Sequence, residues 1–234
     1  MRHINKGKEP RELTRYRSSD RNVTYEDFRD KDVLSSALAK EQGYLCAYCM
    51  QRIEPDAAHM KIEHWKAQST HRELQLIWRN MLGVCKGGEG RPRKTQHCDS
   101  ARGNRELAIT PLDHPDQHLR YTKDGEILAN RPDFQLDIDT KLNLNVEMLK
   151  RSRREVLESV REGLKRTGDS AFTEAALQRQ IRRLKQKDGD GKYVPFCQVM
   201  IFFLEKKLRA VQEQTKQPPA IAKQRSSRQK GKRA

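Results

Sequence analysis

The chain has 234 residues, enough for one domain with an appendage or for two small domains, and only 35% of them are hydrophobic, which predicts a modest core and long charged helices. Its 48 Lys and Arg residues against 32 Asp and Glu residues give a net charge of +16, which favours a polyanionic partner, either nucleic acid or an acidic protein. No apolar run approaches the roughly 20 residues that span a bilayer, and residues 1–6 have no apolar signal region, so neither a membrane-spanning helix nor a secretory signal is predicted and a cytoplasmic protein is expected.

The first predicted unit is a basic N-terminal arm. Residues 1–30 are basic and weakly patterned, so we predict an extended arm followed by a short turn capped by Thr24. From Asp32 onward, apolar residues recur at helical spacing, and Gly43 ends the predicted helix.

The predicted core, residues 31–115, contains two strand signals and a helix signal. Residues 59–64 alternate like a half-buried strand with Met60 and Ile62 on one side, and we expect the polar side to expose His64. An apolar run over residues 76–84 predicts a second strand or short turn. A glycine-rich basic loop follows, and residues 98–107 have helical propensity until Thr110-Pro111.

The third predicted unit, residues 116–215, is a hairpin followed by helices. The hairpin turns at Asp124-Gly125. Helices are predicted from Asn145, over residues 171–187 and from near Pro195, and we expect their apolar faces to pack on each other or to dock a partner protein. Residues 216–234 carry seven cations and no acid, which predicts a disordered basic tail.

Four of the five cysteines predict a structural zinc site. Cys46 and Cys49 form a C-x2-C pair that can chelate one ion, and Cys85 and Cys98 supply two further thiolates. The twelve residues 86–97 separate the second pair, which is wider than a usual knuckle, so His97 competes with Cys98 as the fourth ligand. The fifth cysteine, Cys197, is predicted to be a core thiol. This usage suits reduced intracellular thiols on a metal better than disulfides.

Glu63, His64 and Asp99 lie among these cysteines in the sequence, and hydrolysis of a phosphodiester needs a base for the attacking water and oxygen ligands for a divalent ion. As a neutral imidazole, His64 can take a proton from the attacking water. Glu63 and Asp99 can hold a divalent ion, Mg²⁺ or Mn²⁺, that stabilises the leaving oxygen. Since adjacent strand residues face opposite sides, Glu63 and His64 can share one metal site only where the strand twists or ends. The pattern predicts a small metal-dependent nuclease.

Glu63-His64, Asn80 and Asp99 resemble the three stations of the HNH nuclease motif, whose ββα-metal fold has two strands and a helix around one catalytic ion. The resemblance implies that His64 is the general base, that Asn80 orients the loop or backs the histidine, and that Asp99 is a metal ligand. It implies an α+β, mostly α protein, with a small zinc-stapled ββα-metal core, flanking helices and a C-terminal helical region.

Longer strings narrow the resemblance to one subgroup. Cys46-Ala-Tyr-Cys49, Ile62-Glu-His-Trp65 and residues 78–85 and 97–104 resemble the HNH effector of Septu-type anti-phage systems, the PtuB type, which also accompanies some retrons. The similarity runs to about residue 165. It implies a toxin-like nuclease held in a complex with an ABC/SMC-like ATPase and, in retron settings, with a reverse transcriptase and its RNA–DNA hybrid. DNA is the default substrate that it implies, and tRNA is the alternative.

Cations near the predicted site are candidate nucleic-acid contacts, because each phosphate contact adds salt-dependent affinity. The candidates are Lys86, Arg91, Arg93 and Lys94 in the loop before the last cysteine, and Arg102 after it. For the loop, simple solvation is the alternative. For the whole chain, the rival hypothesis is a zinc-stapled nucleic-acid-binding adaptor without catalysis, in which His64 is dispensable.

Overall fold

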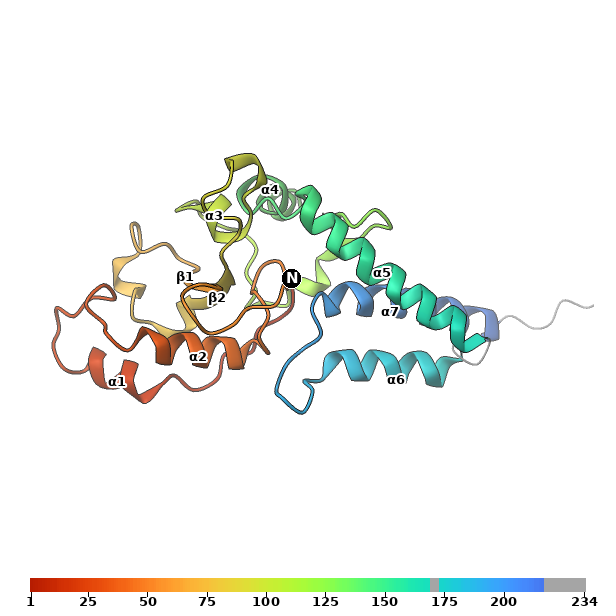
Figure 1. Ribbon diagram of the computed structural model, residues 1–234, viewed down its shortest axis with the longest axis horizontal. Coiled ribbons are helices and arrows are strands. Elements are labelled where there is room, and N and C mark those ends of the chain that lie inside the picture. The colour runs from red at the N-terminus through yellow and green to blue at the C-terminus, as the bar shows by residue number, and fades with distance from the viewer. Residues whose placement is uncertain (169–172, 217–234) are drawn as a thin grey trace, which may run out of the picture.

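The computed structural model describes residues 1–168 and 173–216, and within them the chain is a mostly helical α+β molecule with two small two-stranded sheets. Figure 1 shows an elongated arrangement, with α1, α2 and the β1–β2 sheet at one end and α5, α6 and α7 at the other. The predicted fold class is confirmed at this level. Except for Lys216, the predicted disordered tail lies outside the described residues.

The N-terminal residues do not form the predicted extended arm. Met1 is fully buried and its amine donates a hydrogen bond to the Tyr121 hydroxyl at 3.2 Å, while Ile4 N–H donates to a backbone carbonyl at 2.8 Å. The N-terminus therefore lies between the two ends of the molecule (Figure 1). Residues Arg11–Arg17 form helix α1, which buries Leu13. The prediction missed these contacts because they join segments that are distant in sequence.

Helix α2, Lys31–Glu41, confirms the helix predicted from the apolar spacing. It buries Leu34 and Leu38 against the sheet region, and the chain leaves it through Gly43 at φ +60°. Glycine adopts this left-handed conformation without the steric penalty of a side chain, which explains why the helix ends there. The predicted turn at Thr24 is also present, since Asp27 N–H donates to its hydroxyl at 3.4 Å.

The first sheet pairs strand β1, Met60–His64, with strand β2, Met81–Cys85, antiparallel in the register His64 to Met81. Short 3-10 turns η1 (Arg72–Leu74) and η2 (Trp78–Asn80) connect the strands. Every residue of β2 is buried, as its apolar sequence predicts.

Helix α3, Cys98–Arg102, follows a loop that contains the 3-10 turn η3 (Arg93–Thr95). The helix is shorter than the predicted stretch of residues 98–107, because Gly103 leaves the helical conformation at φ +58°. The two strands and α3 together form a compact unit with α3 beside β2.

The second sheet is the hairpin predicted at Asp-Gly. After the 3-10 turn η4 (Pro115–Gln117), strands β3 (Leu119–Tyr121) and β4 (Ile127–Ala129) pair antiparallel around Gly125. Helix α4 (Pro132–Leu136) and the π-helical turn η5 (Asp137–Lys141) follow and were not predicted.

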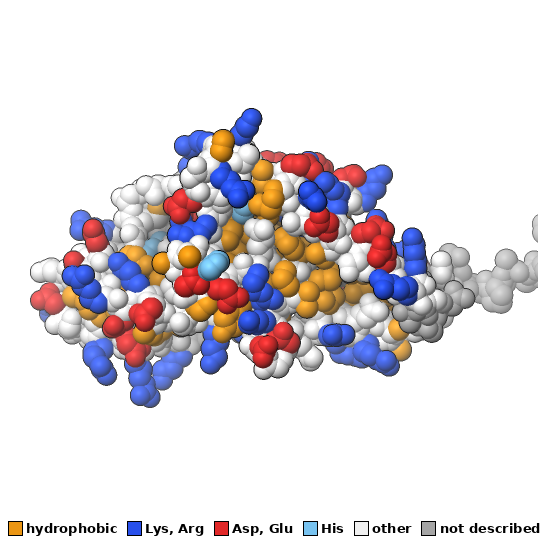
Figure 2. Space-filling view, in the orientation of Figure 1, with side chains coloured by type: hydrophobic (Ala, Val, Ile, Leu, Met, Phe, Trp, Pro, Cys, Tyr) orange, Lys and Arg blue, Asp and Glu red, His pale blue; other side chains and the backbone are white. Residues whose placement is uncertain are grey.

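Three long helices complete the chain: α5 (Glu147–Thr167), α6 (Glu174–Lys185) and α7 (Cys197–Lys216). Their apolar positions mostly pack against one another in one core that is continuous with the rest of the molecule, so little of this surface is left for a partner. Figure 2 shows that some hydrophobic side chains do remain at the surface around α5 and α7. Across residues 1–168 and 173–216, no helix combines the length and apolarity that a membrane crossing needs.

Candidate metal and active site

Four buried cysteine sulfurs meet beside the first sheet. Cys46 and Cys49 lie in the turn after α2, Cys85 ends β2 and Cys98 begins α3. Their Sγ atoms all lie within 4.8 Å of one another, with 3.8 Å between Cys46 and Cys98 and 3.7 Å between Cys49 and Cys85. A tetrahedral zinc about 2.3 Å from each sulfur spaces its ligands about 3.8 Å apart. The cluster can therefore hold a metal such as zinc.

His97, the alternative fourth ligand, lies beside this cluster and is also buried. Its Nδ1 is 3.2 Å from Cys98 Sγ and 3.9 Å from Cys85 Sγ. Because four sulfurs already complete a tetrahedral set, the geometry favours Cys98 as the ligand and leaves His97 to hydrogen-bond a thiolate. Cys197 is buried elsewhere, at the start of α7, as a core thiol.

The three predicted reactive residues line one cavity of about 340 Å³. Glu63 and His64 close strand β1, and Asp99 comes from the first turn of α3. The strand ends at His64, which is the condition under which two adjacent strand residues can reach the same site. The sheet and the thiol cluster therefore bring together His64 and Asp99, which are 35 positions apart in the chain.

His64 is more enclosed than predicted. It has the same parity in the strand as Met60 and Ile62, so the expected exposure on the polar side was wrong, and the residue is only 7% exposed. The Tyr25 ring packs edge-on against the imidazole, with 4.6 Å between centroids.

The hydrogen bonds of His64 define its tautomer. Nε2 lies 2.9 Å from the Gln75 carbonyl oxygen, which can only accept, so Nε2 carries the proton and Nδ1 is the accepting nitrogen. Burial lowers the pKa of His64 below its ordinary value, which favours the neutral ring. The Gln68 amide nitrogen lies 3.0 Å from Nδ1 and donates a hydrogen bond to it. His64 therefore lines the cavity as a neutral ring whose accepting nitrogen is bonded by the Gln68 amide.

Asn80 holds the loop after β1 in place. Its side-chain oxygen accepts from Lys66 N–H at 2.7 Å, and its amide donates to the carbonyls of Lys66 and Leu74 at 3.0 and 3.2 Å. Among the described residues it makes no hydrogen bond with His64. The geometry therefore corresponds to the loop-orienting alternative.

Arg102 has a different position from the one predicted. We expected it to contact nucleic acid, but it is 1% exposed and its guanidinium forms an ion pair with Glu63. It also donates to the Tyr48 hydroxyl at 3.3 Å and to the carbonyls of His64 and Trp65 at 3.1 and 2.6 Å. With its donors occupied inside the protein, Arg102 is a support for the site rather than a phosphate contact.

Glu63 is held by one oxygen. Oε1 accepts from both Arg102 and the Tyr48 hydroxyl, the latter at 3.0 Å. Burial raises the pKa of Glu63 to about 8, and neighbouring Asp99 acts in the same direction, whereas Arg102 opposes the shift. Two carboxylates thus lie close together, with Glu63 buried and Asp99 partly exposed.

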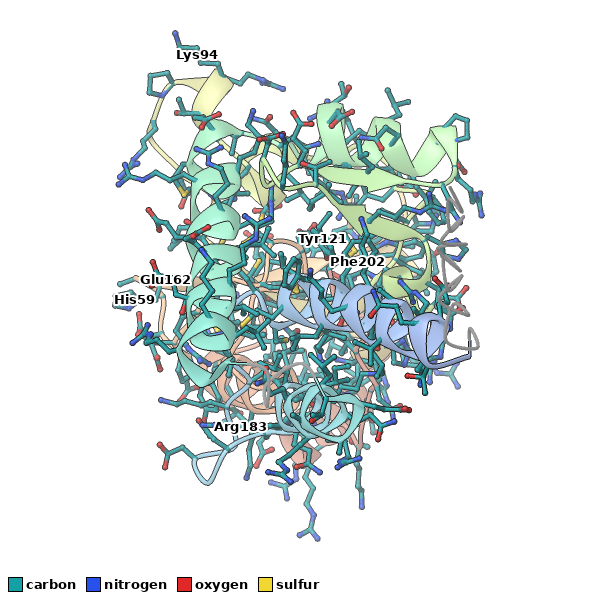
Figure 3. All side chains as sticks on the ribbon, turned by 90° about the vertical axis from the view of Figure 1, so that its right-hand side faces the viewer. His59, Lys94, Tyr121, Glu162, Arg183 and Phe202 are labelled. Carbon is teal, nitrogen blue, oxygen red and sulfur yellow. The ribbon has the colours of Figure 1, made fainter. Side chains whose placement is uncertain are left out.

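The predicted basic loop stands out from the protein surface. Arg91, Arg93 and Lys94 are exposed, and Figure 3 shows Lys94 projecting at the tip of the loop. Lys86 instead lies 3.5 Å from Glu89, which also binds Lys61 at 2.8 Å. Lys61 in turn lies 3.1 Å from Asp99, so the loop and the cavity share one ion-pair network.

Sequence reasoning missed Tyr25, Tyr48, Lys61 and Gln68. For Tyr48 the one available signal was its position inside the C-x2-C turn, which ties it to the thiol cluster. The others carry no local signal, because their contacts with the site come only from the tertiary fold.

No protein-family model matches the chain. The chain is 27% identical over 231 aligned residues to an Escherichia coli protein named "Retron Ec83 putative HNH endonuclease", which covers 79% of this chain and 85% of that protein. It is 32% identical over 91 residues to the Septu protein PtuB of Bacillus thuringiensis, which covers 38% of this chain and 33% of PtuB. The resemblance to HNH effectors of retron and Septu defence systems is thereby confirmed.

Proposed function

We propose that this chain is a metal-dependent HNH endonuclease that hydrolyses phosphodiester bonds and acts as the toxic effector of an anti-phage defence complex. The observation that carries the proposal is the meeting of Glu63, His64 and Asp99 in one cavity beside a four-thiol cluster. The order of two strands and a helix around that cavity supports a ββα-metal core. The names of the two relatives support the setting in defence.

The chemistry follows from the arrangement of these side chains. In the proposed step the attacking water replaces the Gln68 amide at His64 Nδ1, and Nδ1 takes its proton. Nε2 stays bonded to the Gln75 carbonyl, which keeps the ring in the productive tautomer. Asn80 holds the loop that carries Gln68 at the cavity. Arg102 and Tyr48 orient Glu63, because both donate hydrogen bonds to its Oε1.

Glu63 and Asp99 would hold the catalytic ion, Mg²⁺ or Mn²⁺. The fit rests on their own chemistry. Hard carboxylate oxygens suit these ions, and a divalent cation would favour the ionised form of Glu63, whose pKa is raised first by burial and then by the neighbouring Asp99. When bound, the ion supplies charge stabilisation at the phosphate and the leaving oxygen. The four cysteines would hold a structural zinc.

DNA is the substrate that we propose by default, and tRNA is the second candidate because one relative is named for a retron. An ABC/SMC-like ATPase is the proposed partner, with a reverse transcriptase and its RNA–DNA hybrid where a retron is present. The exposed loop cations Arg91, Arg93 and Lys94 are the proposed phosphate contacts beside the site.

The test is a cleavage assay with the purified chain, alone and with its ATPase partner, on supercoiled plasmid and on tRNA. We expect cleavage with Mg²⁺ or Mn²⁺ and none after EDTA, and the polymer that is cut identifies the substrate. A chain that cuts neither polymer under any of these conditions, yet binds both, would be the zinc-stapled adaptor instead.

The support of Glu63 by Tyr48 gives a second prediction. Tyr48→Phe removes one hydrogen bond to Oε1 and leaves the Arg102 ion pair. Since loss of a group that orients a metal ligand weakens metal binding about 10- to 100-fold, we expect the Mg²⁺ concentration for half-maximal cleavage to rise by about 10-fold or more, with unchanged zinc content. Tyr16→Phe is the control, because its hydroxyl bonds a carbonyl outside the cavity, that of Thr24. Equal Mg²⁺ requirements in both variants would contradict this role.

A further inference from the structure

A groove crosses the C-terminal part of the molecule, apart from the cavity of Glu63 and His64. Helix α7 forms its floor, and α5 and the β3–β4 hairpin form its walls, enclosing about 480 Å³. Figure 3 shows Tyr121 and Phe202 in the space between α5 and the hairpin, above α7. None of the residues that line this groove also lines the reactive cavity.

Aromatic rings line the groove. Phe202 and Phe203 follow one another on α7 and are both only partly buried, and Tyr121 packs edge-on against Phe202 with 5.7 Å between ring centroids. Aromatic side chains that keep part of their surface in water are suited to stacking with a planar group, and every nucleobase has such a face.

The same groove carries a strong positive charge. It is lined by five cations and one acid, Glu213, so the side chains that line it carry a net charge of +4. Four of these cations, namely Lys123, Lys206, Lys207 and Arg209, are exposed and have no ion pair among residues 1–168 and 173–216. The fifth, Arg161, lies with its guanidinium 5.5 Å from the centre of the Phe203 ring. An anionic partner is therefore favoured.

Two adjacent rings on α7 are followed one helical turn later by two adjacent cations. Lys206 follows Phe202 by four residues and Lys207 follows Phe203 by four residues, so each cation lies about one helical turn, or about 5.4 Å, from its ring. The Lys207 ammonium is 5.9 Å from the Phe203 centroid. A single-stranded nucleic acid likewise presents each base close to a phosphate.

We propose that this groove binds single-stranded nucleic acid, with bases stacked on Phe202 and Phe203 and phosphates on Lys206, Lys207 and Arg161. An acidic amphipathic helix fits less well, because such a helix needs a continuous apolar strip with charges at the edges. In this groove the cationic groups of Arg161 and Lys207 lie within 6 Å of the centre of the Phe203 ring, at 5.5 and 5.9 Å, so no continuous apolar strip is present. Duplex fits less well too, because its bases are hidden from stacking.

The test measures binding without cleavage, so its outcome is separable from that of the nuclease proposal. The full chain carrying His64→Ala is titrated with fluorescein-labelled oligothymidine and oligouridine of about 16 nucleotides, and with a duplex of equal length. The two oligonucleotides distinguish DNA from RNA as the bound strand.

The groove variant is Lys206→Glu with Lys207→Glu. Its matched control is Arg182→Glu with Arg183→Glu, an equal change of charge at exposed positions of α6. We expect the groove variant to lose about ten-fold or more in single-strand affinity, and the slope of log affinity against log salt to fall by about 1.4, which is two contacts at about 0.7 each. The control should change affinity much less.

Stacking is tested by Phe203→Leu, which keeps an apolar side chain. We expect several-fold weaker binding of the single strands with an unchanged salt slope and unchanged duplex binding. Equal losses in the two charge variants would mean general attraction to a basic protein and would overturn the proposal. Unchanged single-strand binding in both the groove variant and Phe203→Leu would also overturn the proposal. In that case, a synthetic acidic helical peptide that binds wild type but not these variants would identify the groove as a protein-binding site.

Discussion

Replacing His64 with Ala is expected to reduce nucleic-acid cleavage by about 10²- to 10⁴-fold, the usual contribution of a positioned general base. The substitution removes the lone pair on Nδ1 and leaves Glu63 and Asp99 in place. Folding should survive, because the imidazole ring only bonds one backbone carbonyl and the Gln68 amide and packs edge-on against Tyr25. Single-turnover cleavage with saturating Mg²⁺ measures the effect on the chemical step.

His59→Ala is the matched control. His59 lies just before the same strand, is exposed, and its ring binds Asp56, at 2.8 Å. Figure 3 shows it at the outside of the molecule. Its loss should leave cleavage within about two-fold of wild type, since surface substitutions change stability by only about 0.5 kcal/mol. A His64→Ala variant as active as His59→Ala would rule out the imidazole as the base and the hydrolytic mechanism built on it.

The sequence was sufficient to predict the local features of the site. The C-x2-C spacing, the alternation before His64 and the apolar run before Cys85 each describe neighbouring residues, so they predicted the thiol cluster and the two strands. The meeting of His64 and Asp99 was predictable too, because cysteines that flank both residues are drawn to one cluster.

Tertiary contacts were not predictable in this way. Arg102 is a charged residue on a short helix, and its sequence context favours exposure; only the folded chain places it against Glu63, where an ion pair and three carbonyls compensate its burial. Residues 1–30 appeared unpatterned because Met1 and Tyr25 each contact partners far along the chain.

The C-terminal helices illustrate a further limit. Amphipathic spacing identified them correctly, but spacing does not say what covers an apolar face. Of the two predicted roles for these apolar faces, packing of the helices on each other is confirmed by Leu157, Leu177 and Ile201, which lie in the core, while docking of a partner stays a prediction. What remains accessible is the groove over α7, whose aromatic and cationic residues come from three separate elements.

The second large effect is expected from the thiol cluster. Cys46→Ser should abolish bound zinc, cleavage and the cooperative thermal transition together, because zinc binding supplies folding free energy, about 10–16 kcal/mol in zinc-finger peptides. The cluster joins the turn after α2, the end of β2 and the start of α3. The cluster also positions both sides of the reactive cavity. Tyr48 lies in the same turn as Cys46 and bonds Glu63, and Asp99 follows Cys98 directly.

Cys197→Ser is the control for the Cys46 variant, since it makes the same substitution at a thiol that is equally buried but outside the cluster. Burying a hydroxyl there costs about 1–3 kcal/mol if it finds no partner, so this variant should melt at lower temperature yet keep one zinc per chain and its activity. Elemental analysis separates the two cases directly. If Cys46→Ser retained its metal, the ligands would lie elsewhere, and Glu63 and Asp99 would have to be positioned by packing alone. If it lost zinc but kept a sharp melting transition, the core shared by Met1 and the C-terminal helices, rather than the metal, would supply the stability of the fold.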